Sequence, residues 1–307
     1  MTTPAVTTES AVSAVSVAIV TVTFVTVTIV TVAKDRREHL ERQFAGIDAQ
    51  TRPPDEHVII DLGGPPIDER PRTTVIRWDV GGRALPVGEA RNRGAVIADS
   101  DVLIFLDVDC VPTPGLVADY ADLVVEHPGI VCGPVGYLPA LAPDAFFDGE
   151  GRLAATSLRA GSSYQPGRPR PGEQTRRSDR YELFWSLSFA VHRSTWNDLG
   201  GFDNAFDGYG GEDTDLAWTA RSGGIELFFT GRAEAFHQHH AISSPPVEHL
   251  HDIVRNATVF HHKWGQWPMA GWLAEFNDLG LIDWTPTSSR IGAPPESPAW
   301  FRSDSGR

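Results

Sequence analysis

Short apolar runs alternate with segments of mixed polarity through the first third of the chain. Four runs rich in β-branched and large apolar residues predict strands, near residues 25–33, 57–61, 74–78 and 101–107. Two intervening segments predict helices, over residues 36–47 and 88–98. The run 101–107 is apolar without alternation, so we expect a strand that is covered on both faces. This order of elements predicts an α/β domain with a mainly parallel central sheet and helices on both faces.

The first strand follows a long uncharged stretch, residues 11–33, which also reaches the length of a membrane-spanning helix. Basic residues follow it directly, as they do on the cytoplasmic side of a membrane anchor. The stretch contains no leucine, however, and its second half alternates valine with threonine, which is typical of a strand. We favour a strand preceded by a low-complexity leader over residues 1–18, with a membrane anchor as the alternative.

The second half of the chain begins with a change in composition. A strand near 130–138 is followed, over residues 151–180, by a segment rich in glycine, proline, serine and arginine. We expect a mobile, locally positive loop there, which is either a solvated linker or a lid over phosphates. Buried structure over 181–192, a strand at 225–229 and a helix over 247–264 are expected next. Residues 285–307 have the composition of a disordered tail.

Composition and charge narrow the classes of function. The 307 residues include 40 acidic and 26 basic side chains, for a net charge of −14. This balance argues against sequence-independent binding of nucleic acid, which needs basic surface. The chain has only two cysteines, Cys110 and Cys132, without the spacing of a metal site. We interpret both as buried small side chains in a protein of a reducing compartment.

Carboxylates stand where predicted strands end. Asp61 closes the second strand, and Asp107 and Asp109 close the apolar strand before them. In parallel sheets, ligands bind beyond the carboxyl ends of the strands. Alternate residues of an extended chain point to the same side, so Asp107 and Asp109 are expected to face one site. Two carboxylates at a strand end suit Mg²⁺ or Mn²⁺ with positions left for phosphate oxygens.

The chain is organised around a glycine-rich segment, residues 200–221, which leads into acidic residues at 212, 213 and 215. Apolar residues at helical spacing follow, so Glu212 and Asp213 are predicted on the first turn of a helix that ends near Gly223. Acidic residues are favoured at that position by the helix dipole alone. Three of them behind a glycine-rich loop also suit a site in which a carboxylate removes a proton from a hydroxyl.

Histidines and tryptophans supply further candidates. His237, His239 and His240 lie within four positions, and at least one is expected to bind a metal. If the segment is extended, His237 and His239 share a face and His240 points away. Trp264, Trp267 and Trp272 could stack against a sugar, although packing in the core is the alternative.

Taken together, these motifs resemble nucleotide-sugar-dependent glycosyltransferases of the GT-A fold. The stretches Ala90–Gly94 and Phe105–Asp109 are similar to family 2 glycosyltransferases. The stretch 200–215, with its core Gly-Tyr-Gly-Gly-Glu-Asp, resembles β-1,4-galactosyltransferases and polypeptide N-acetylgalactosaminyltransferases. The resemblance implies one GT-A domain over 19–284, with a nucleotide-binding half at 19–135 and an acceptor and catalytic half at 136–284.

The resemblance also implies roles for individual residues. Asp107 and Asp109 would bind Mn²⁺ (or Mg²⁺) and the sugar diphosphate, with Asp109 as the metal ligand. Asp61 would contact the nucleotide base, and Arg91 the ribose or the phosphates. Asp213 would be the catalytic base.

The remaining roles concern the sugars and the metal. Glu212 would hold the donor or acceptor sugar. His237, with His239 as a second candidate, would complete the metal shell. Thr214 departs from the galactosyltransferase pattern, which has a third consecutive acid at this position, and that pattern's methionine ligand has no evident counterpart here.

The implied function is metal-dependent transfer of a sugar from a nucleotide-sugar, expected to be a UDP-sugar, to an acceptor hydroxyl with inversion. The partners would be that donor and a carbohydrate, lipid or small-molecule acceptor, with no nucleic acid. We expect a cytoplasmic protein that could associate with the inner face of a membrane. The alternatives are a non-catalytic carbohydrate-binding or degenerate transferase module and, less favoured, a sugar nucleotidyltransferase.

Overall fold

The computed structural model describes residues 25–142, 145–241 and 243–292. Its main feature is an eight-stranded sheet with the strand order β3-β2-β1-β4-β9-β6-β10-β8. The strands are β1 (Val27–Ala33), β2 (Glu56–Asp61), β3 (Thr73–Arg77), β4 (Val102–Leu106), β6 (Ile130–Cys132), β8 (Arg176–Ser178), β9 (Ser188–His192) and β10 (Leu227–Phe229).

The sheet is mainly parallel, as the order of elements predicted. β1 pairs in parallel with β2 and β4, and β10 pairs in parallel with β6. β9 runs antiparallel between β4 and β6, and β8 is an antiparallel edge strand on β10. All five residues of β4 are buried, which confirms that both faces of this strand are covered.

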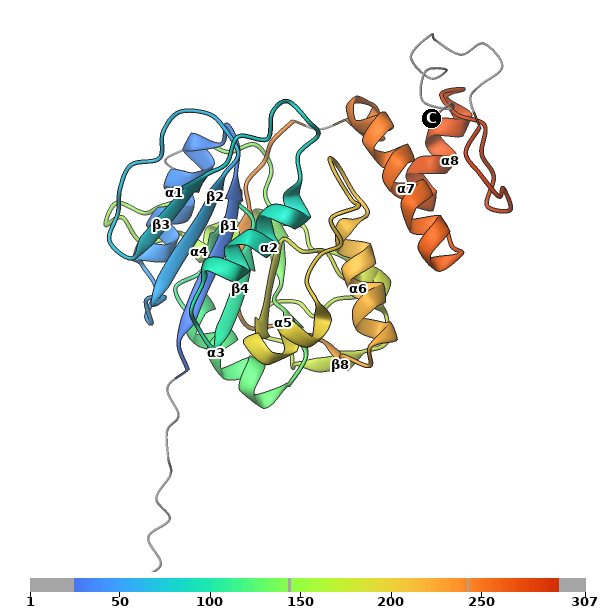
Figure 1. Ribbon diagram of the computed structural model, residues 1–307. Helices are drawn as coiled ribbons and strands as arrows, with labels where there is room; N and C mark the ends of the chain where they lie inside the picture. The colour runs from blue at the N-terminus through green and yellow to red at the C-terminus, as the bar shows by residue number, and fades with distance from the viewer. Residues whose placement is uncertain (1–24, 143–144, 242, 293–307) are drawn as a thin grey trace, which may run out of the picture.

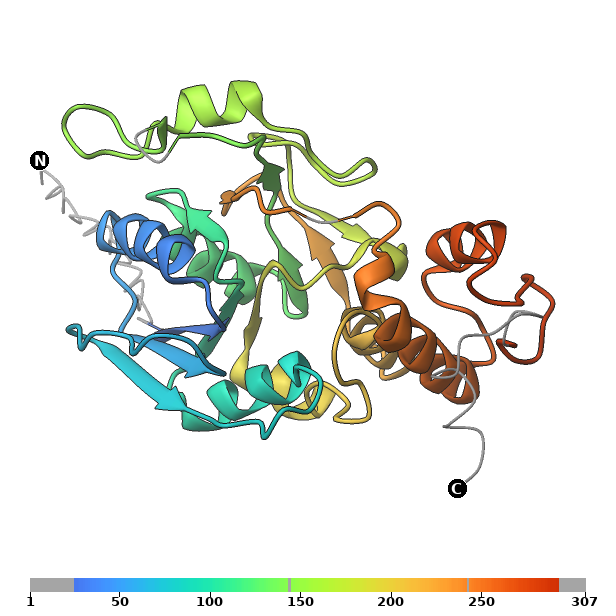
Figure 2. The same cartoon turned by 90° about the horizontal axis from the view of Figure 1, so that it is seen from above.

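Helices cover the two faces and enclose two hydrophobic clusters. One cluster lies under α2 (Val87–Ile97), α5 (Arg193–Leu199) and α6 (Glu212–Ser222), and it includes Phe105, Phe189 and Trp196. The other lies under α1 (Arg37–Asp48) and α3 (Leu116–Glu126), and it includes Ile104 and Tyr120. Figure 1 shows α2, α5 and α6 in front of the sheet, and Figure 2 shows α1 and α2 on opposite sides of it.

A second, three-stranded sheet lies beside the first. Its order is β5-β11-β7, with β5 at Cys110–Pro112, β11 at Ala235–His237 and β7 at Val135–Tyr137. β5 is antiparallel to β11 and β7 is parallel to it, so that His237 lies opposite both Cys110 and Tyr137. This small sheet therefore joins the chain just after Asp109 to the histidine-rich segment.

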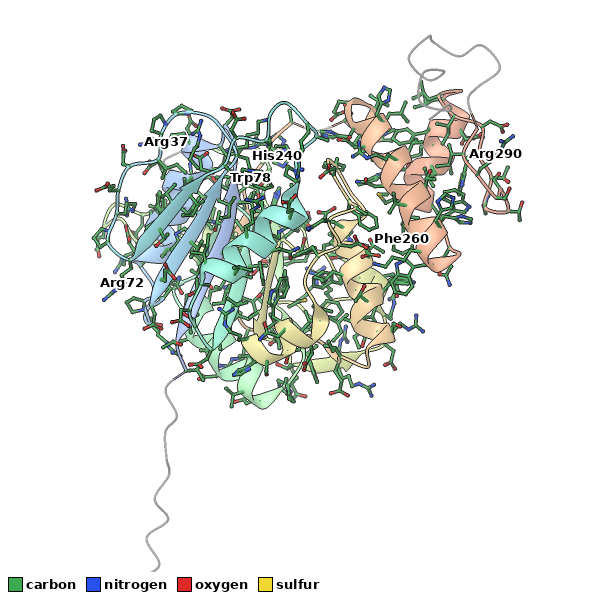
Figure 3. All side chains as sticks on the ribbon, in the orientation of Figure 1. Arg37, Arg72, Trp78, His240, Phe260 and Arg290 are labelled. Carbon is green, nitrogen blue, oxygen red and sulfur yellow. The ribbon has the colours of Figure 1, made fainter. Side chains whose placement is uncertain are left out.

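The last helices form a separate layer that packs on α6. A short 3-10 turn (Val247–His249) leads into α7 (Leu250–Trp264), which is followed by α8 (Ala270–Asp278), and the pair encloses its own apolar cluster. Figure 1 shows both helices projecting away from the central sheet. Phe260 of α7 contacts Trp218 of α6 edge to face, with ring centroids 5.8 Å apart, and Figure 3 shows Phe260 at this junction.

Several details differ from the sequence-based predictions. The strand expected over 130–138 is two strands, β6 and β7, which belong to different sheets. The segment 151–180, expected to be a mobile loop, contains α4 (Ala155–Gly161) and β8, and it leads into a short 3-10 turn at Tyr181–Leu183. Residues 285–292 form turns and a bridge between Asp283 and Gly292, whereas the rest of the predicted tail lies outside the described residues.

The N-terminal predictions can be compared only in part. β1 matches the strand expected near 25–33, and the leader over 1–18 lies outside the described residues. None of the helices in the described ranges is both long and apolar enough to cross a membrane. Cys110 and Cys132 are both buried, as expected, and both are free thiols.

Candidate functional site

The site is built on the turn that follows β4. The Cys110 N–H donates to the Asp107 carbonyl over 2.8 Å, so residues 107–110 turn instead of continuing as an extended strand. The side chain of Gln43, which is fully buried, donates to the carbonyls of Asp107 and Cys110 over 2.7 and 3.1 Å and holds this turn from α1. The backbone is therefore not extended here as the alternation argument assumed. Asp107 and Asp109 have different hydrogen-bonding partners, although burial raises the pKa of Asp107 and Asp109 lies close enough to add to that rise.

Asp109 faces two histidines. Its Oδ2 lies 3.5 Å from the Nε2 atoms of both His237 and His240. Pairing of β5 with β11 brings His237 to this position, and the Gln238 N–H fixes the register by donating to the Asp109 carbonyl over 2.8 Å. Figure 3 shows His240 at the end of the molecule where β1 and β2 end.

The histidine pair differs from the one that alternation predicted. β11 ends at His237, and residues 238–240 belong to no strand. His240 turns back toward Asp109, and the cluster of potential metal ligands contains His237 and His240 but not His239. The grouping of His237 with His239 was wrong for this physical reason.

The three side chains fit a divalent cation. One ligand atom from each of Asp109, His237 and His240 lies within 4.8 Å of the others. Asp109 Oδ1 is buried without a hydrogen-bond partner, and burial lowers the pKa of His240, which favours the neutral imidazole that binds metals. One carboxylate and two imidazoles suit Mn²⁺ as well as other first-row transition metals, whereas Mg²⁺ prefers oxygen ligands.

Asp107 belongs to a second group, which is centred on Arg91 of α2. Arg91 Nη2 donates to Asp107 Oδ1 over 2.7 Å, and Arg91 Nη1 lies 3.5 Å from Oε1 of Glu212. The Arg91 side chain is only 5% exposed, so the carboxylates of Asp107 and Glu212, rather than water, balance its charge. The structure thus brings Arg91 and Asp107 together with Glu212, which follows the glycine-rich loop.

The acidic residues at the start of α6 have raised pKa values. Burial and the neighbouring Asp213 carboxylate raise the pKa of Glu212 to about 7. Burial likewise raises the pKa of Asp213, against the opposing effect of the Thr214 N–H, which donates to its Oδ1 over 2.7 Å. Glu212 Oε2 is buried without a hydrogen-bond partner. Clusters of carboxylates with raised pKa values are typical of sites that bind or deprotonate a substrate.

The glycine-rich loop before α6 adopts a conformation that needs glycine. Gly211, which precedes the helix, has a φ of +96°, and Gly208 has a φ of +73°. A Cβ on Gly208 would lie 2.1 Å from a carboxylate oxygen of Asp252. Asp252 Oδ2 instead accepts the Tyr209 N–H over 3.2 Å. The glycine therefore allows α7 to contact the loop backbone directly.

Helix α7 holds this loop through a residue that the sequence did not single out. Asn256 is fully buried, and its Nδ2 donates to the carbonyls of Asp207 and Gly210 over 2.8 and 2.7 Å. Lys263 Nζ bridges Asp203 and Asp215 over 2.8 and 2.9 Å. A periodicity analysis assigns Asn256 to the inner face of a helix, but no local signal reveals its distant partners.

Other predicted candidates have structural partners. Asp61 lies at the end of β2, where it accepts from Arg77 Nη1 over 2.7 Å. Trp264 Nε1 donates to the buried Asp215 over 2.7 Å. Trp267 stacks on His261 with centroids 3.9 Å apart, and Trp272 lies 5.9 Å from the ring of Tyr209. Trp264 therefore links α7 to α6, and Trp267 packs on α7 within the C-terminal apolar cluster.

Comparisons with known proteins cover both halves of this site. Residues 28–139 match the family model described as glycosyl transferase family 2, and residues 171–241 match the one described as N-terminal domain of galactosyltransferase. The first range includes Arg91 and Asp109, and the second includes Glu212, Asp213 and His237. A search of curated protein sequences returned no match.

A solved structure shares the fold. A crystal structure of GalNAc-T7 with UDP, GalNAc and Mn²⁺ superimposes with a TM-score of 0.51 at 17% identity, over 77% of this chain and 50% of that one. The chain therefore spans about half the length of that protein. TarS of S. aureus superimposes with a TM-score of 0.49 at 12% identity, over 82% of this chain and 43% of that one. The large sheet flanked by helices, together with the GalNAc-T7 structure and the family 2 match, confirms the GT-A fold.

Proposed function

We propose that this chain, a GT-A fold glycosyltransferase with a family 2-like half and a galactosyltransferase-type half, transfers a sugar from a UDP-sugar to an acceptor hydroxyl with inversion. The observation that carries the proposal is that two clusters lie close together at the end of the sheet, where, besides burial, Asp109 and His237 both affect the pKa of Asp107. Asp109, His237 and His240 form one, and Arg91, Asp107 and Glu212 form the other. The GalNAc-T7 structure, which holds UDP and Mn²⁺, supports this choice of donor and cation.

Asp109, His237 and His240 would hold the divalent cation. When bound, a cation of this kind supplies positive charge that stabilises a departing nucleoside diphosphate. Asp61, at the end of the second strand, would contact the nucleotide base. Because the end of a parallel sheet is where ligands bind in α/β folds, these residues would place the donor above β1, β2 and β4.

Arg91 positions the carboxylates rather than a phosphate. Its guanidinium donates to Asp107 and faces Glu212, and its side chain is almost fully buried. In this arrangement Arg91 opposes the rise in the pKa of Glu212 that burial causes. Glu212, with one oxygen free of hydrogen bonds, would accept from a hydroxyl of the donor or acceptor sugar.

Asp213 would remove the proton from the acceptor hydroxyl. Its pKa is raised by burial, which makes the carboxylate a better proton acceptor than an exposed aspartate. The Thr214 N–H and the start of α6 orient the carboxylate. A base that acts on the acceptor during bond formation corresponds to direct displacement, and direct displacement inverts the anomeric carbon.

The experiment follows release of UDP from a panel of UDP-sugars with Mn²⁺, with and without saccharide acceptors. We expect release from at least one donor, and NMR of the product should show the inverted anomer. Retention of configuration would contradict the role of Asp213 as base. Absence of both transfer and donor hydrolysis, in protein that binds a glycan, would favour a non-catalytic carbohydrate-binding module.

A further inference from the structure

His240 reaches Asp109 because the chain turns directly after β11. Its Nε2 lies 3.5 Å from Asp109 Oδ2, as does that of His237, and the two imidazole rings are 5.3 Å apart. Three residues of extended chain span about 10 Å, so an extended segment would carry His240 away from Asp109. Residues 238–240 belong to no strand. The position of His240 therefore depends on what holds this turn.

His237, in contrast, is held by the small sheet. It is paired with Cys110 on β5 and with Tyr137 on β7, and its carbonyl accepts from the Leu138 N–H over 3.0 Å. The ring of Tyr137 lies 5.2 Å from the ring of His237. Strand pairing ends where β11 ends, so it places the first imidazole of the cluster and does not place the second.

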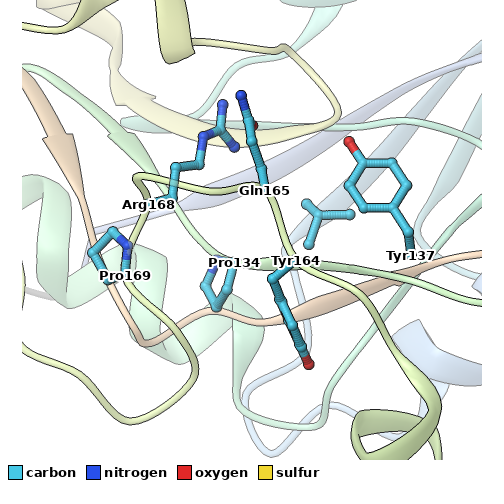
Figure 4. A pocket seen from close by; sticks show the side chains of 7 residues that line it. Pro134, Tyr137, Tyr164, Gln165, Arg168 and Pro169 are labelled. Carbon is cyan, nitrogen blue, oxygen red and sulfur yellow. The ribbon is translucent and has the colours of Figure 1, made fainter.

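Tyr137 also lines a small cavity. Figure 4 shows Tyr137 at one side of it and Arg168 and Pro169 at the other. The cavity has a volume of about 10 Å³, which is room for about one water molecule. A sugar does not fit there, so the contribution of Tyr137 to the cluster is its contact with His237. The contacts that hold the turn after β11 come from α1.

Gln238, the first residue after β11, is anchored at three points. Its N–H donates to the Asp109 carbonyl over 2.8 Å, and its Nε2 donates to the His39 carbonyl of α1 over 3.0 Å. Its Oε1 accepts from Nη1 of Arg42, also on α1, over 3.0 Å. Gln238 is only 1% exposed. Its backbone is thus tied to the turn that carries Asp109 and its side chain to a helix, which fixes the direction in which the chain leaves β11.

Arg42 is itself held in place for this contact. Its Nη2 lies 3.4 Å from Oε2 of Glu38, and its guanidinium lies 5.2 Å from the centroid of Phe146. The next residue, Gln43, donates to two carbonyls of the turn at residues 107–110. Helix α1 therefore contacts both of the segments that supply ligands to the cation-binding cluster.

The two partners of Gln238 on α1 require different groups. The His39 carbonyl needs a donor and the Arg42 guanidinium needs an acceptor, and a side-chain amide supplies both. Methionine has a similar length but would leave both partners without these hydrogen bonds at a buried position. Glutamate would accept from Arg42 but would place a carboxylate oxygen against the carbonyl of His39. The amide is therefore matched to this place between β11 and α1.

We propose that Gln238 is a positioning residue of the cation site. By tying the chain after β11 to α1, it turns residues 238–240 back toward Asp109 and sets the distance between the imidazoles of His237 and His240. Gln238 supplies no ligand atom itself. The inference rests on the cation site of the proposed function, and it adds that the affinity of this site depends on hydrogen bonds between α1 and the segment that carries the histidines.

The experiment is calorimetric titration of the full chain with Mn²⁺ alone, for wild type and Gln238→Met. We expect the variant to bind Mn²⁺ roughly 10- to 100-fold more weakly, the range for residues that orient metal ligands without binding the metal. The loss should appear although Asp109, His237 and His240 are all unchanged.

The matched control is Gln50→Met. Gln50 is a second buried glutamine, just beyond the C-terminal end of α1, and its amide also makes three hydrogen bonds, to the carbonyls of Gly46 and Thr113 and from the N–H of Val117. Its replacement should lower the free energy of unfolding in urea about as much as Gln238→Met does, and it should leave the affinity for Mn²⁺ unchanged.

A second variant tests the contact with Arg42. Arg42→Lys keeps the positive charge but loses the planar guanidinium, so it should weaken Mn²⁺ binding. In the Gln238→Met background the same change should have no further effect, because Arg42 acts on the cluster through Gln238. Additive losses in the double variant would contradict the inference. If Gln238→Met does not fold, the Mn²⁺ affinity of Arg42→Lys decides the question.

A measurement without metal separates this inference from the proposed function. In EDTA and at a single pH, the imidazole NMR signals of His240, assigned with His240→Gln, should shift in Gln238→Met and stay in place in Gln50→Met. Wild-type protein that binds no Mn²⁺ would contradict the proposed cation site, and these spectra would then decide whether Gln238 positions His240. Equal Mn²⁺ affinity of wild type and Gln238→Met, an equal loss in Gln50→Met, or unchanged His240 signals would overturn the inference.

Discussion

The pH dependence of stability should distinguish the buried carboxylates at the start of α6 from exposed acidic residues at the start of an ordinary helix, and Glu212 is the residue to test. Replacing Glu212 with Gln keeps the size and hydrogen-bonding capacity of the side chain and removes its ionisation. In the folded chain burial and Asp213 raise the pKa of Glu212 from its ordinary 4.5 to about 7. We expect this difference to make the stability of the wild-type protein depend on pH in a way that the variant does not share.

The sign follows from proton binding. Between pH 4.5 and pH 7 the folded state holds a proton at Glu212 that the unfolded state has released, so the free energy of unfolding decreases as pH rises. Above pH 7 Glu212 is ionised in both the folded and the unfolded state, so this group no longer makes the free energy of unfolding depend on pH. A pKa difference of about 2.5 corresponds to about 3 kcal/mol, at about 1.4 kcal/mol per pKa unit.

The assay is urea denaturation of wild type and Glu212→Gln at pH 5 and pH 8, with EDTA present so that no cation contributes. The variant should gain about 2 to 3 kcal/mol relative to wild type between these two pH values. Glu248→Gln is the control, because Glu248 is exposed and its pKa is lowered by its backbone N–H. It should show no such gain. Parallel pH profiles for wild type and Glu212→Gln would refute the buried-carboxylate account.

Three further predictions concern the base, the cation ligands and the loop. Asp213→Asn should reduce transfer by roughly 10²- to 10⁴-fold, the contribution typical of a general base, while calorimetry shows UDP affinity nearly unchanged; an equal loss of affinity would make Asp213 a donor-binding residue. His240→Ala should weaken Mn²⁺ binding by at least about tenfold in a direct titration, whereas its neighbour variant His239→Ala should not; equal effects would contradict the geometry. Asn256→Ala should cost about 1 to 3 kcal/mol in urea denaturation and lower kcat, because two loop carbonyls lose their donor; unchanged stability and kcat would show that α7 does not position the loop.

Much of the fold was predictable because local patterns and global structure agree. The apolar runs 25–33, 57–61 and 101–107 correspond to strands β1, β2 and β4, and the helix that begins at Glu212 was predicted from the glycine loop and the acidic first turn. The strand near 130–138 was not resolved into two, since a short apolar run carries no signal for a change of sheet.

The sequence predicted most of the residues of the site, but not which of them contact one another. Asp109 and His237 were expected together, and strand pairing brings them together. The alternation argument assumed extended backbone, but residues 107–110 form a turn and β11 ends at His237. Asp107 therefore pairs with Arg91, and His240 rather than His239 lies beside Asp109. Such errors arise because alternation is valid only while a strand continues.

Other long-range contacts could not be predicted from the sequence. Arg168 lies in a segment whose composition suggests a solvated loop, and only the folded chain shows it against Phe229 and the Leu183 carbonyl. Asn256 similarly reaches carbonyls 46 and 49 positions earlier in the chain. Pairings of this kind depend on tertiary structure and leave no periodic pattern in the sequence.

The most direct test of the proposed function is calorimetric titration of the purified protein with UDP in Mn²⁺ and then in EDTA, repeated with Asp109→Ala. We predict binding that requires the cation and is lost in the variant. Binding of UDP that is equal in Mn²⁺, in EDTA and in Asp109→Ala, or no binding of UDP under any of these conditions, would contradict a cation-dependent donor site at Asp109, His237 and His240.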